Sequence, residues 1–272
     1  MNRIDAIFAT GCDGPGSIVP YICAGDPDAE STCAMLHAFG GMGIELVEVG
    51  IPFSDPVGDG RSIAEAARRA LGGGMTLAKT LDICRSVQNP PAIVLFSYLN
   101  PIAMYGIERL ARDARRSNVS GVIIADLPLD ESAEIARVLR RFGIALTLLI
   151  APGTPLQRAV AIAEASDGFA YVVSRLGVTG ASLEPDIEAV ERRLKLLRSH
   201  TRRPLAVGFG VGRPEHVRRL VGHADAMVVG SALVDAVARR SNEEDPVRAA
   251  QRFLQPLLTA TVASKPFRVK VQ

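Results

Sequence analysis

Short apolar runs rich in β-branched residues recur along the chain and alternate with longer stretches of mixed polarity. The apolar runs lie at 17–24, 44–50, 92–98, 121–126, 145–151, 169–174, 204–210 and 225–231. Most are nearly continuous in apolar residues, which is typical of strands buried on both faces in a parallel sheet. The stretches at 28–43, 62–74, 76–87, 106–118, 130–143 and 154–166 have the spacing of amphipathic helices, and a glycine often closes them, as at Gly143.

A predicted strand is followed by a predicted helix about eight times in succession, which indicates an α/β fold of the (β/α)8 TIM-barrel type. We expect a single barrel domain over residues 1–262 that includes a short extra helix at the N-terminus. An open doubly wound sheet is the alternative, but the number of runs and the lack of an early GxGxxG favour the barrel. The tail 263–272 has no periodicity, and we expect it to lack regular structure.

Composition narrows the classes of function. The chain has 272 residues, is 48% hydrophobic and carries a net charge of +2, which argues against a strongly charged nucleic-acid or membrane surface. The four cysteines form no CxxC pair and the four histidines do not fall at metal-ligand spacing with them, so we expect free thiols and no metal. No apolar run resembles a signal peptide or is long enough to span a bilayer, and we expect a cytoplasmic protein.

We expect the catalytic residues at the carboxyl ends of the predicted strands, where barrel enzymes place their active sites. Glu48 lies inside the second apolar run, and burial there would raise its pKa toward the range in which a carboxyl group both gives and takes protons. The alternative is a strand carboxylate that reaches solvent or pairs with an arginine. Asp59 follows in a loop, either as a turn or helix-start residue or as a carboxylate on a closing loop. Asp126 ends the fourth run and is either a capping or a functional residue.

Three glycine-containing loops follow the sixth, seventh and eighth runs, as "RLGVTGAS", "GFGVGRPEHV" and "VVGSALVDAV". Glycines let backbone N–H groups approach an anion, and helix N-termini add a favourable dipole. Barrels frequently bind phosphate with the loops after strands seven and eight. The pattern therefore predicts a small phosphorylated metabolite as ligand, with ordinary tight turns as the alternative.

The segments "EVGIPFSDPVGDG", "YICAGDPD", "SYLNPI", "ADLPLDES", "SRLGVTGA" and "VGFGV" occur in order across about residues 17–235. Together they resemble the alpha subunit of tryptophan synthase. The resemblance implies retro-aldol cleavage of indole-3-glycerol phosphate to indole and glyceraldehyde 3-phosphate, in tryptophan biosynthesis and without a cofactor in this chain. It also implies a pyridoxal-phosphate beta subunit as partner in an α2β2 heterotetramer.

The resemblance assigns roles to single residues. Glu48 is the acid/base that handles protonation at indole C3, and Asp59 holds the indole N–H and offsets positive charge on the ring. The residues expected to bind the rest of the substrate are Tyr98, Asn100, Asp126, Leu127, Tyr171, Thr179 and Phe209. The residues expected to form the phosphate cradle are Gly180, Gly210, Val211, Gly212, Gly230 and Ser231.

The chain departs from the family pattern in and around the aspartate loop. Gly58 stands where alanine is common, Arg61 replaces a proline and Ala64 replaces a glutamine. Cys23 stands where threonine is usual, and Gly212 where serine is common at the phosphate. These changes leave two alternatives to an ordinary alpha subunit: a stand-alone lyase that releases free indole, and a weakly catalytic subunit that activates a beta partner.

Overall fold

The architecture is a ring of parallel strands surrounded by helices. The computed structural model describes residues 2–9, 17–174, 186–208, 210–241 and 243–263. The strands are β1 (Ser17–Cys23), β2 (Leu46–Gly50), β3 (Ala92–Ser97), β4 (Val119–Ile124), β5 (Ala145–Thr147), β6 (Leu149–Ile150), β7 (Ala170–Val173), β8 (Leu205–Gly208) and β9 (Ala226–Val229). All the strand pairs described are parallel.

The sheet closes on itself through a divided fifth strand. Its order is β5-β4-β3-β2-β1-β9-β8-β7-β6, so the two strands at the ends of this order are consecutive in the chain. Only Leu148 separates β5 from β6, and its backbone N–H is donated to the Ser166 hydroxyl. The fifth apolar run therefore occupies one position in the ring, with one half paired to β4 and the other to β7. The predicted TIM barrel is confirmed.

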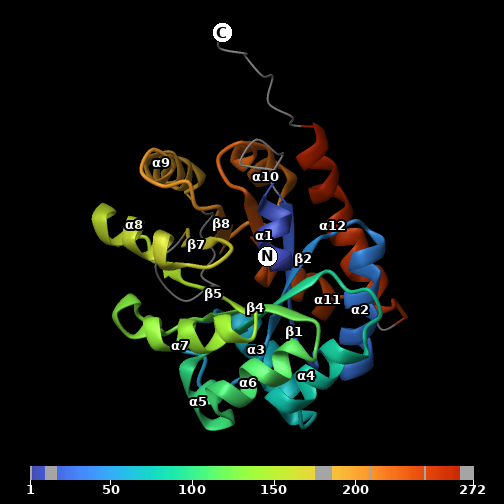
Figure 1. Cartoon of the computed structure of the whole chain (residues 1–272). Coiled ribbons are helices and arrows are strands. Elements are labelled where there is room, and N and C mark those ends of the chain that lie inside the picture. The colour runs from blue at the N-terminus through green and yellow to red at the C-terminus, as the bar shows by residue number, and fades with distance from the viewer. Residues whose placement is uncertain (1, 10–16, 175–185, 209, 242, 264–272) are drawn as a thin grey trace.

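Helices flank the ring on its outer side, except the first, which covers one end of the barrel (Figure 1). They are α1 (Arg3–Phe8), α2 (Ala29–Gly41), α3 (Arg61–Gly72), α4 (Leu77–Ser86), α5 (Leu99–Tyr105), α6 (Ile107–Arg115), α7 (Leu129–Arg141), α8 (Leu156–Ala165), α9 (Ile187–Arg198), α10 (Pro214–Leu220), α11 (Ser231–Ala238) and α12 (Pro246–Ala263). The sequence pattern did not predict α5, which contains Pro101. The proline lies in the first turn, where a helix tolerates the missing N–H. None of the described helices is both long and apolar enough to cross a membrane.

The expected N-terminal helix, α1, lies at the centre of the ring of strands in the view of Figure 1. Ile4 is fully buried and packs onto Gly121 and Gly168, where an added Cβ would come within 2.7 and 2.5 Å of its side chain. The Asn2 side chain caps α1 and donates to the carbonyl groups of Ser120 and Gly143. The helix therefore covers one end of the barrel, and the strand ends that carry the candidate residues lie at the other.

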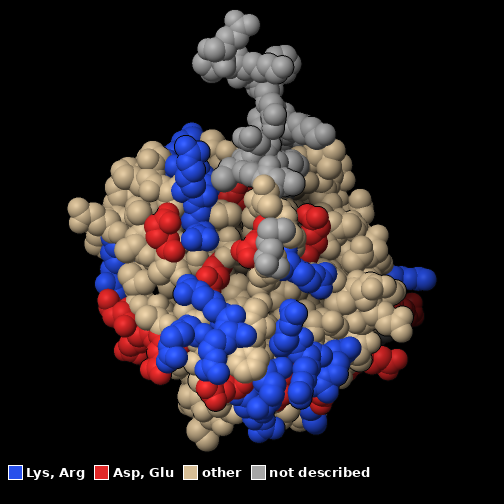
Figure 2. Space-filling model, viewed as in Figure 1, with Lys and Arg blue, Asp and Glu red and all other residues tan. Residues whose placement is uncertain are grey.

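Arginines and lysines gather over the lower part of the face shown in Figure 2. Arginines of α4 and α6 are paired with carboxylates of the same helix. Asp113 lies within 3.6 Å of both Arg109 and Arg112, and Arg85 lies 3.5 Å from Asp82. The surface is therefore a mixture of both charges, in keeping with the small net charge of the chain.

Candidate active site

Glu48 points into the barrel from the middle of β2. Its side chain is only 2% exposed, and its Oε1 atom has no hydrogen-bond partner among the described residues. The register places it between Tyr21 of β1 and Val94 of β3. Burial raises the pKa of Glu48 to about 8, because the charged form loses its hydration and gains no compensating partner. At neutral pH this carboxyl group holds its proton.

Asp59 belongs to the segment 51–60, which connects β2 to α3. Its backbone N–H is donated to the Pro56 carbonyl group, 2.9 Å away, and its side chain forms a hydrogen bond with Tyr98. Burial raises the pKa of Asp59 to about 6, and the hydrogen bond from Tyr98 opposes that rise. Asp59 is therefore mostly ionised at pH 7, whereas Glu48 is mostly protonated.

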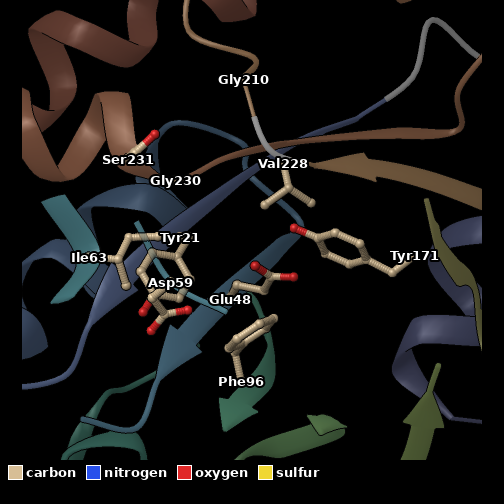
Figure 3. Close-up of a pocket in the computed structure, with 10 residues that line it drawn as sticks. All are labelled: Tyr21, Glu48, Asp59, Ile63, Phe96, Tyr171, Gly210, Val228, Gly230 and Ser231. Atoms are coloured by element: carbon tan, nitrogen blue, oxygen red, sulfur yellow. The ribbon is translucent and has the colours of Figure 1, made fainter. Parts of the chain in front are cut away.

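Both carboxyl groups line one pocket at the strand ends (Figure 3). The pocket has a cavity volume of about 30 Å³ and is partly open to solvent. Its lining residues are Tyr21, Glu48, Asp59, Ile63, Phe96, Tyr171, Gly210, Val228, Gly230 and Ser231. Three of these are aromatic, and Tyr21 and Phe96 meet edge to face with their ring centroids 6.1 Å apart. The combination of flat apolar walls and two carboxyl groups fits an aromatic ligand with one polar edge.

Two glycines make room for the tyrosines of the pocket. A Cβ on Gly50 would lie 2.1 Å from the Tyr21 hydroxyl, and one on Gly208 would lie 2.0 Å from the Tyr171 hydroxyl. Neither strand position could carry a side chain without displacing a ring. Burial raises the pKa of both phenols, so they remain neutral in the pocket.

The opposite side of the pocket has the features of an anion site. Gly230 precedes α11, and Ser231 is the first residue of that helix. A helix N-terminus presents backbone N–H groups and the positive end of its dipole. Gly210, two residues after the last residue of β8, adds a residue without a side chain and with φ +110°. These three members of the predicted phosphate cradle lie together on the pocket wall.

Gly212 packs closely against α11, since a Cβ at this position would come within 2.8 Å of the Ala232 methyl group. The glycine that replaces the serine of the family pattern therefore has a packing reason. Val211 is buried beside it. Neither residue lines the pocket, so their place in the cradle stays a prediction.

The other predicted substrate residues are distributed more widely. Tyr171 lines the pocket, and Tyr98 contacts Asp59 from beside it. Asp126 accepts the Leu99 backbone N–H at 2.7 Å and so caps α5, while Asn100 is exposed in the first turn of that helix. Leu127 is buried but does not line the pocket. Thr179, Gly180 and Phe209 lie outside the described residues.

Sequence reasoning missed four residues of the pocket wall: Tyr21, Ile63, Phe96 and Val228. Two of them, Tyr21 and Phe96, follow from the strand register, which the sequence alone does not fix. Glu48 points into the barrel, and its register partners Tyr21 and Val94 point the same way. Side chains two positions apart on a strand share a face, so Phe96 lies on the same face as Val94. Among the described residues, no group of three His, Cys, Asp or Glu could hold a metal ion.

Comparison with known proteins identifies the relatives of this chain. The family model described as tryptophan synthase alpha chain matches residues 11–262. The tryptophan synthase alpha chain of Rippkaea orientalis is 40% identical over 247 residues, which are 90% of this chain and 92% of that one. The corresponding protein of Laribacter hongkongensis is 42% identical over 241 residues, covering 87% and 91% of the two chains.

Solved structures give the same result. The crystal structure of tryptophan synthase subunit alpha from Legionella pneumophila matches with a TM-score of 0.87 and 29% identity, covering 97% of this chain and 99% of that one. A chain from the tryptophan synthase α2β2 complex of Pyrococcus furiosus matches with a TM-score of 0.80 and 34% identity, covering 90% and 98%.

Proposed function

This chain belongs to the tryptophan synthase alpha chain family, carbon–carbon lyases that cleave indole-3-glycerol phosphate in tryptophan biosynthesis, and we propose that Glu48 and Asp59 are its catalytic pair. One observation carries the proposal. The two carboxyl groups line the same pocket with pKa values of about 8 and about 6, so the pair holds one proton at neutral pH. Such a separation assigns the acid to Glu48 and the charged partner to Asp59.

The reaction begins with transfer of the Glu48 proton to C3 of the indole ring. Positive charge then develops at the ring nitrogen, where the Asp59 carboxylate accepts the N–H hydrogen bond and stabilises it. The hydroxyl group on the adjacent glycerol carbon gives its proton to the Glu48 carboxylate and becomes an aldehyde. As the bond from that carbon to C3 breaks, its electron pair returns to the ring. Indole and glyceraldehyde 3-phosphate result, and Glu48 is protonated again.

The pocket orients this substrate between two fixed ends. The indole lies among the aromatic walls beside Glu48, and the phosphate lies at the N-terminus of α11, against Gly230 and Ser231. Binding energy from the phosphate holds the reacting carbons beside the carboxyl groups, which is where proximity lowers the barrier.

The chemistry requires no cofactor in this chain, and pyridoxal phosphate belongs to the beta subunit of the family. We infer that the chain assembles with such a subunit as α2β2, as the Pyrococcus furiosus relative does. Its place of action is the cytoplasm, where the pathway supplies its substrate. Val57, 82% exposed at the tip of the aspartate loop, gives that loop an apolar contact point for a partner.

The test is steady-state cleavage of indole-3-glycerol phosphate by the purified chain, with and without a cognate beta subunit. We expect slow turnover alone and a strong rise with the partner. Glu48→Gln and Asp59→Asn should each lose about 10²-fold or more in kcat, as expected for a general acid and for its electrostatic partner. Glu45→Gln is the matched control, because Glu45 is exposed one residue before β2.

Three results would change the conclusion. Full activity in the Glu48 variant contradicts the mechanism. Fast turnover that the partner leaves unchanged indicates a stand-alone lyase. Absence of turnover under both conditions indicates a subunit that only activates its partner.

A further inference from the structure

The segment that carries Asp59 is attached to the barrel by a tyrosine. Within residues 52–59, the backbone bonds join Val57 to Asp55 and Asp59 to Pro56, so they are internal to the segment. Across the described part of the chain, the hydrogen bonds of this segment to a residue outside it are those with Tyr98. The flanking residues are anchored by the bond from the Ile51 N–H to the Phe96 carbonyl group and by the start of α3 at Gly60, so between these anchors Tyr98 is the side chain that hydrogen-bonds the segment to the barrel.

Tyr98 contacts both ends of the segment. Its hydroxyl oxygen accepts the Gly58 backbone N–H at 3.0 Å, and the same hydroxyl forms a hydrogen bond with Asp59. Its ring lies against Phe53 with the ring centroids 5.5 Å apart. One side chain thus holds the beginning of the segment by ring contact and the end by two hydrogen bonds.

The direction of these bonds follows from the state of the phenol. Burial, with the nearby Asp59 charge as a second cause, raises the pKa of Tyr98, so the phenol keeps its proton. The oxygen has one proton to donate and accepts the N–H of Gly58. The proton is therefore directed to the Asp59 carboxylate, which favours the charged form of Asp59.

Tyr98 is itself firmly placed. It is 4% exposed, directly follows β3 and is the N-cap residue of α5. The next residue, Leu99, donates its backbone N–H to Asp126 at 2.7 Å, which ties the start of α5 to the loop after β4. A side chain fixed by a strand end, a helix start and a neighbouring loop can hold the segment of Asp59 in one position.

We propose that Tyr98 is a positioning residue that holds the aspartate segment at the pocket and keeps Asp59 charged before the substrate arrives. This inference rests on the proposed function, and it gives Tyr98 a role other than the substrate contact that the resemblance suggests. Gly58 fits the role, since a Cβ there would come within 3.2 Å of the Tyr98 hydroxyl and crowd the bond. Glycine at this position permits the close approach of the backbone.

The other ionisable groups near Asp59 leave its titration distinct. Tyr21 and Cys23 on β1 and Tyr171 on β7 face it, and burial raises the pKa of all three, so they stay neutral between pH 5 and 9. Glu48 on β2 titrates higher, at about 8. The substrate phosphate, whose second pKa is about 6, contributes equally to the profiles of wild type and variant, so a difference between their acid limbs reports Asp59.

The experiment compares Tyr98→Phe with Tyr105→Phe. Tyr105 is the last residue of α5, the helix that Tyr98 precedes, and it donates its hydroxyl to Asp113 at 2.8 Å, so both variants lose a tyrosine–aspartate hydrogen bond. We expect Tyr98→Phe to lower kcat about tenfold to a hundredfold and to move the acid limb of kcat/KM to higher pH, because Asp59 loses the donor that favours its charge. Tyr105→Phe should leave both unchanged.

A wild-type profile in Tyr98→Phe, with Asp59→Asn inactive in the same assay, overturns the positioning role and leaves the proposed function standing. Full activity in Asp59→Asn overturns the proposed function first. Hydrogen exchange in the wild-type chain tests the bond without a variant. The Gly58 amide should exchange more slowly than in an unstructured peptide although the residue is exposed, and exchange at the unstructured rate contradicts the proposal.

Discussion

The Glu48→Gln variant should become more stable relative to the wild type as the pH rises, although the substitution removes the catalytic acid. In the folded chain the pKa of Glu48 is about 8, against an ordinary value of 4.5. Between these values the unfolded chain releases a proton that the folded chain keeps. Folding stability therefore declines with rising pH in the wild type, and the decline is complete once pH passes the folded pKa. Glutamine does not titrate and is free of this decline.

The size of the effect follows from the difference between the ordinary pKa of 4.5 and the folded pKa of about 8. Each unit corresponds to about 1.4 kcal/mol, so the wild type should lose about 5 kcal/mol relative to the variant across this range. Burying an amide near the unpartnered Oε1 position can also cost free energy. That cost does not vary with pH, so it adds a constant to the difference in free energy of unfolding between the two proteins. It leaves the slope with pH unchanged, and the slope is the quantity to compare.

Urea unfolding followed by circular dichroism at pH 5, 6, 7, 8 and 9 measures the free energy of unfolding of both proteins. The difference should grow by about 1.4 kcal/mol per unit and level off above pH 8. Glu45→Gln, the same change at an exposed position three residues away, should produce no such trend. A difference that is flat with pH would refute the assignment of a buried, protonated Glu48.

Two further predictions concern the walls of the pocket. Ser231→Asp places a carboxylate at the phosphate end, so KM for the substrate should rise about tenfold or more by like-charge repulsion while kcat changes less; an unchanged KM would remove Ser231 from the cradle. Gly208→Ala brings a Cβ to 2.0 Å from the Tyr171 hydroxyl, so the ring must move. We expect it to cost about 1–3 kcal/mol of stability in urea unfolding and to reduce kcat, whereas Gly41→Ala, with no atom within 4 Å of the added Cβ, should do neither.

Much of this fold follows from local pattern. Continuous apolar runs separated by amphipathic stretches suffice for a parallel barrel, because both faces of each strand are covered. The same pattern places Glu48 at mid-strand among apolar neighbours, which is why its burial was predictable. The division of the fifth run at Leu148 was not, since "ALTLLIA" is apolar throughout and nothing local marks a break in pairing.

The rest of the site depends on contacts between segments far apart in the chain. Tyr21 and Phe96 become wall residues through the register of β1 and β3 on β2, which no local pattern fixes. Asp126 caps α5 across 27 residues of sequence, and α5 was not itself predicted. The bond of Tyr98 to Gly58 likewise requires the path of the loop. The motifs predicted which two residues form the catalytic pair. The contacts that hold these residues in place could be found only from the tertiary structure.

The most direct test of the catalytic assignment is the pH dependence of kcat/KM for cleavage of indole-3-glycerol phosphate by the purified chain. Asp59 must be ionised and Glu48 protonated, with pKa values of about 6 and about 8. We expect a bell-shaped profile that rises through pH 6 as Asp59 loses its proton and falls through pH 8 as Glu48 loses its own. A rate that continues to rise above pH 8 would mean that Glu48 acts in its charged form, and would contradict its role as the acid.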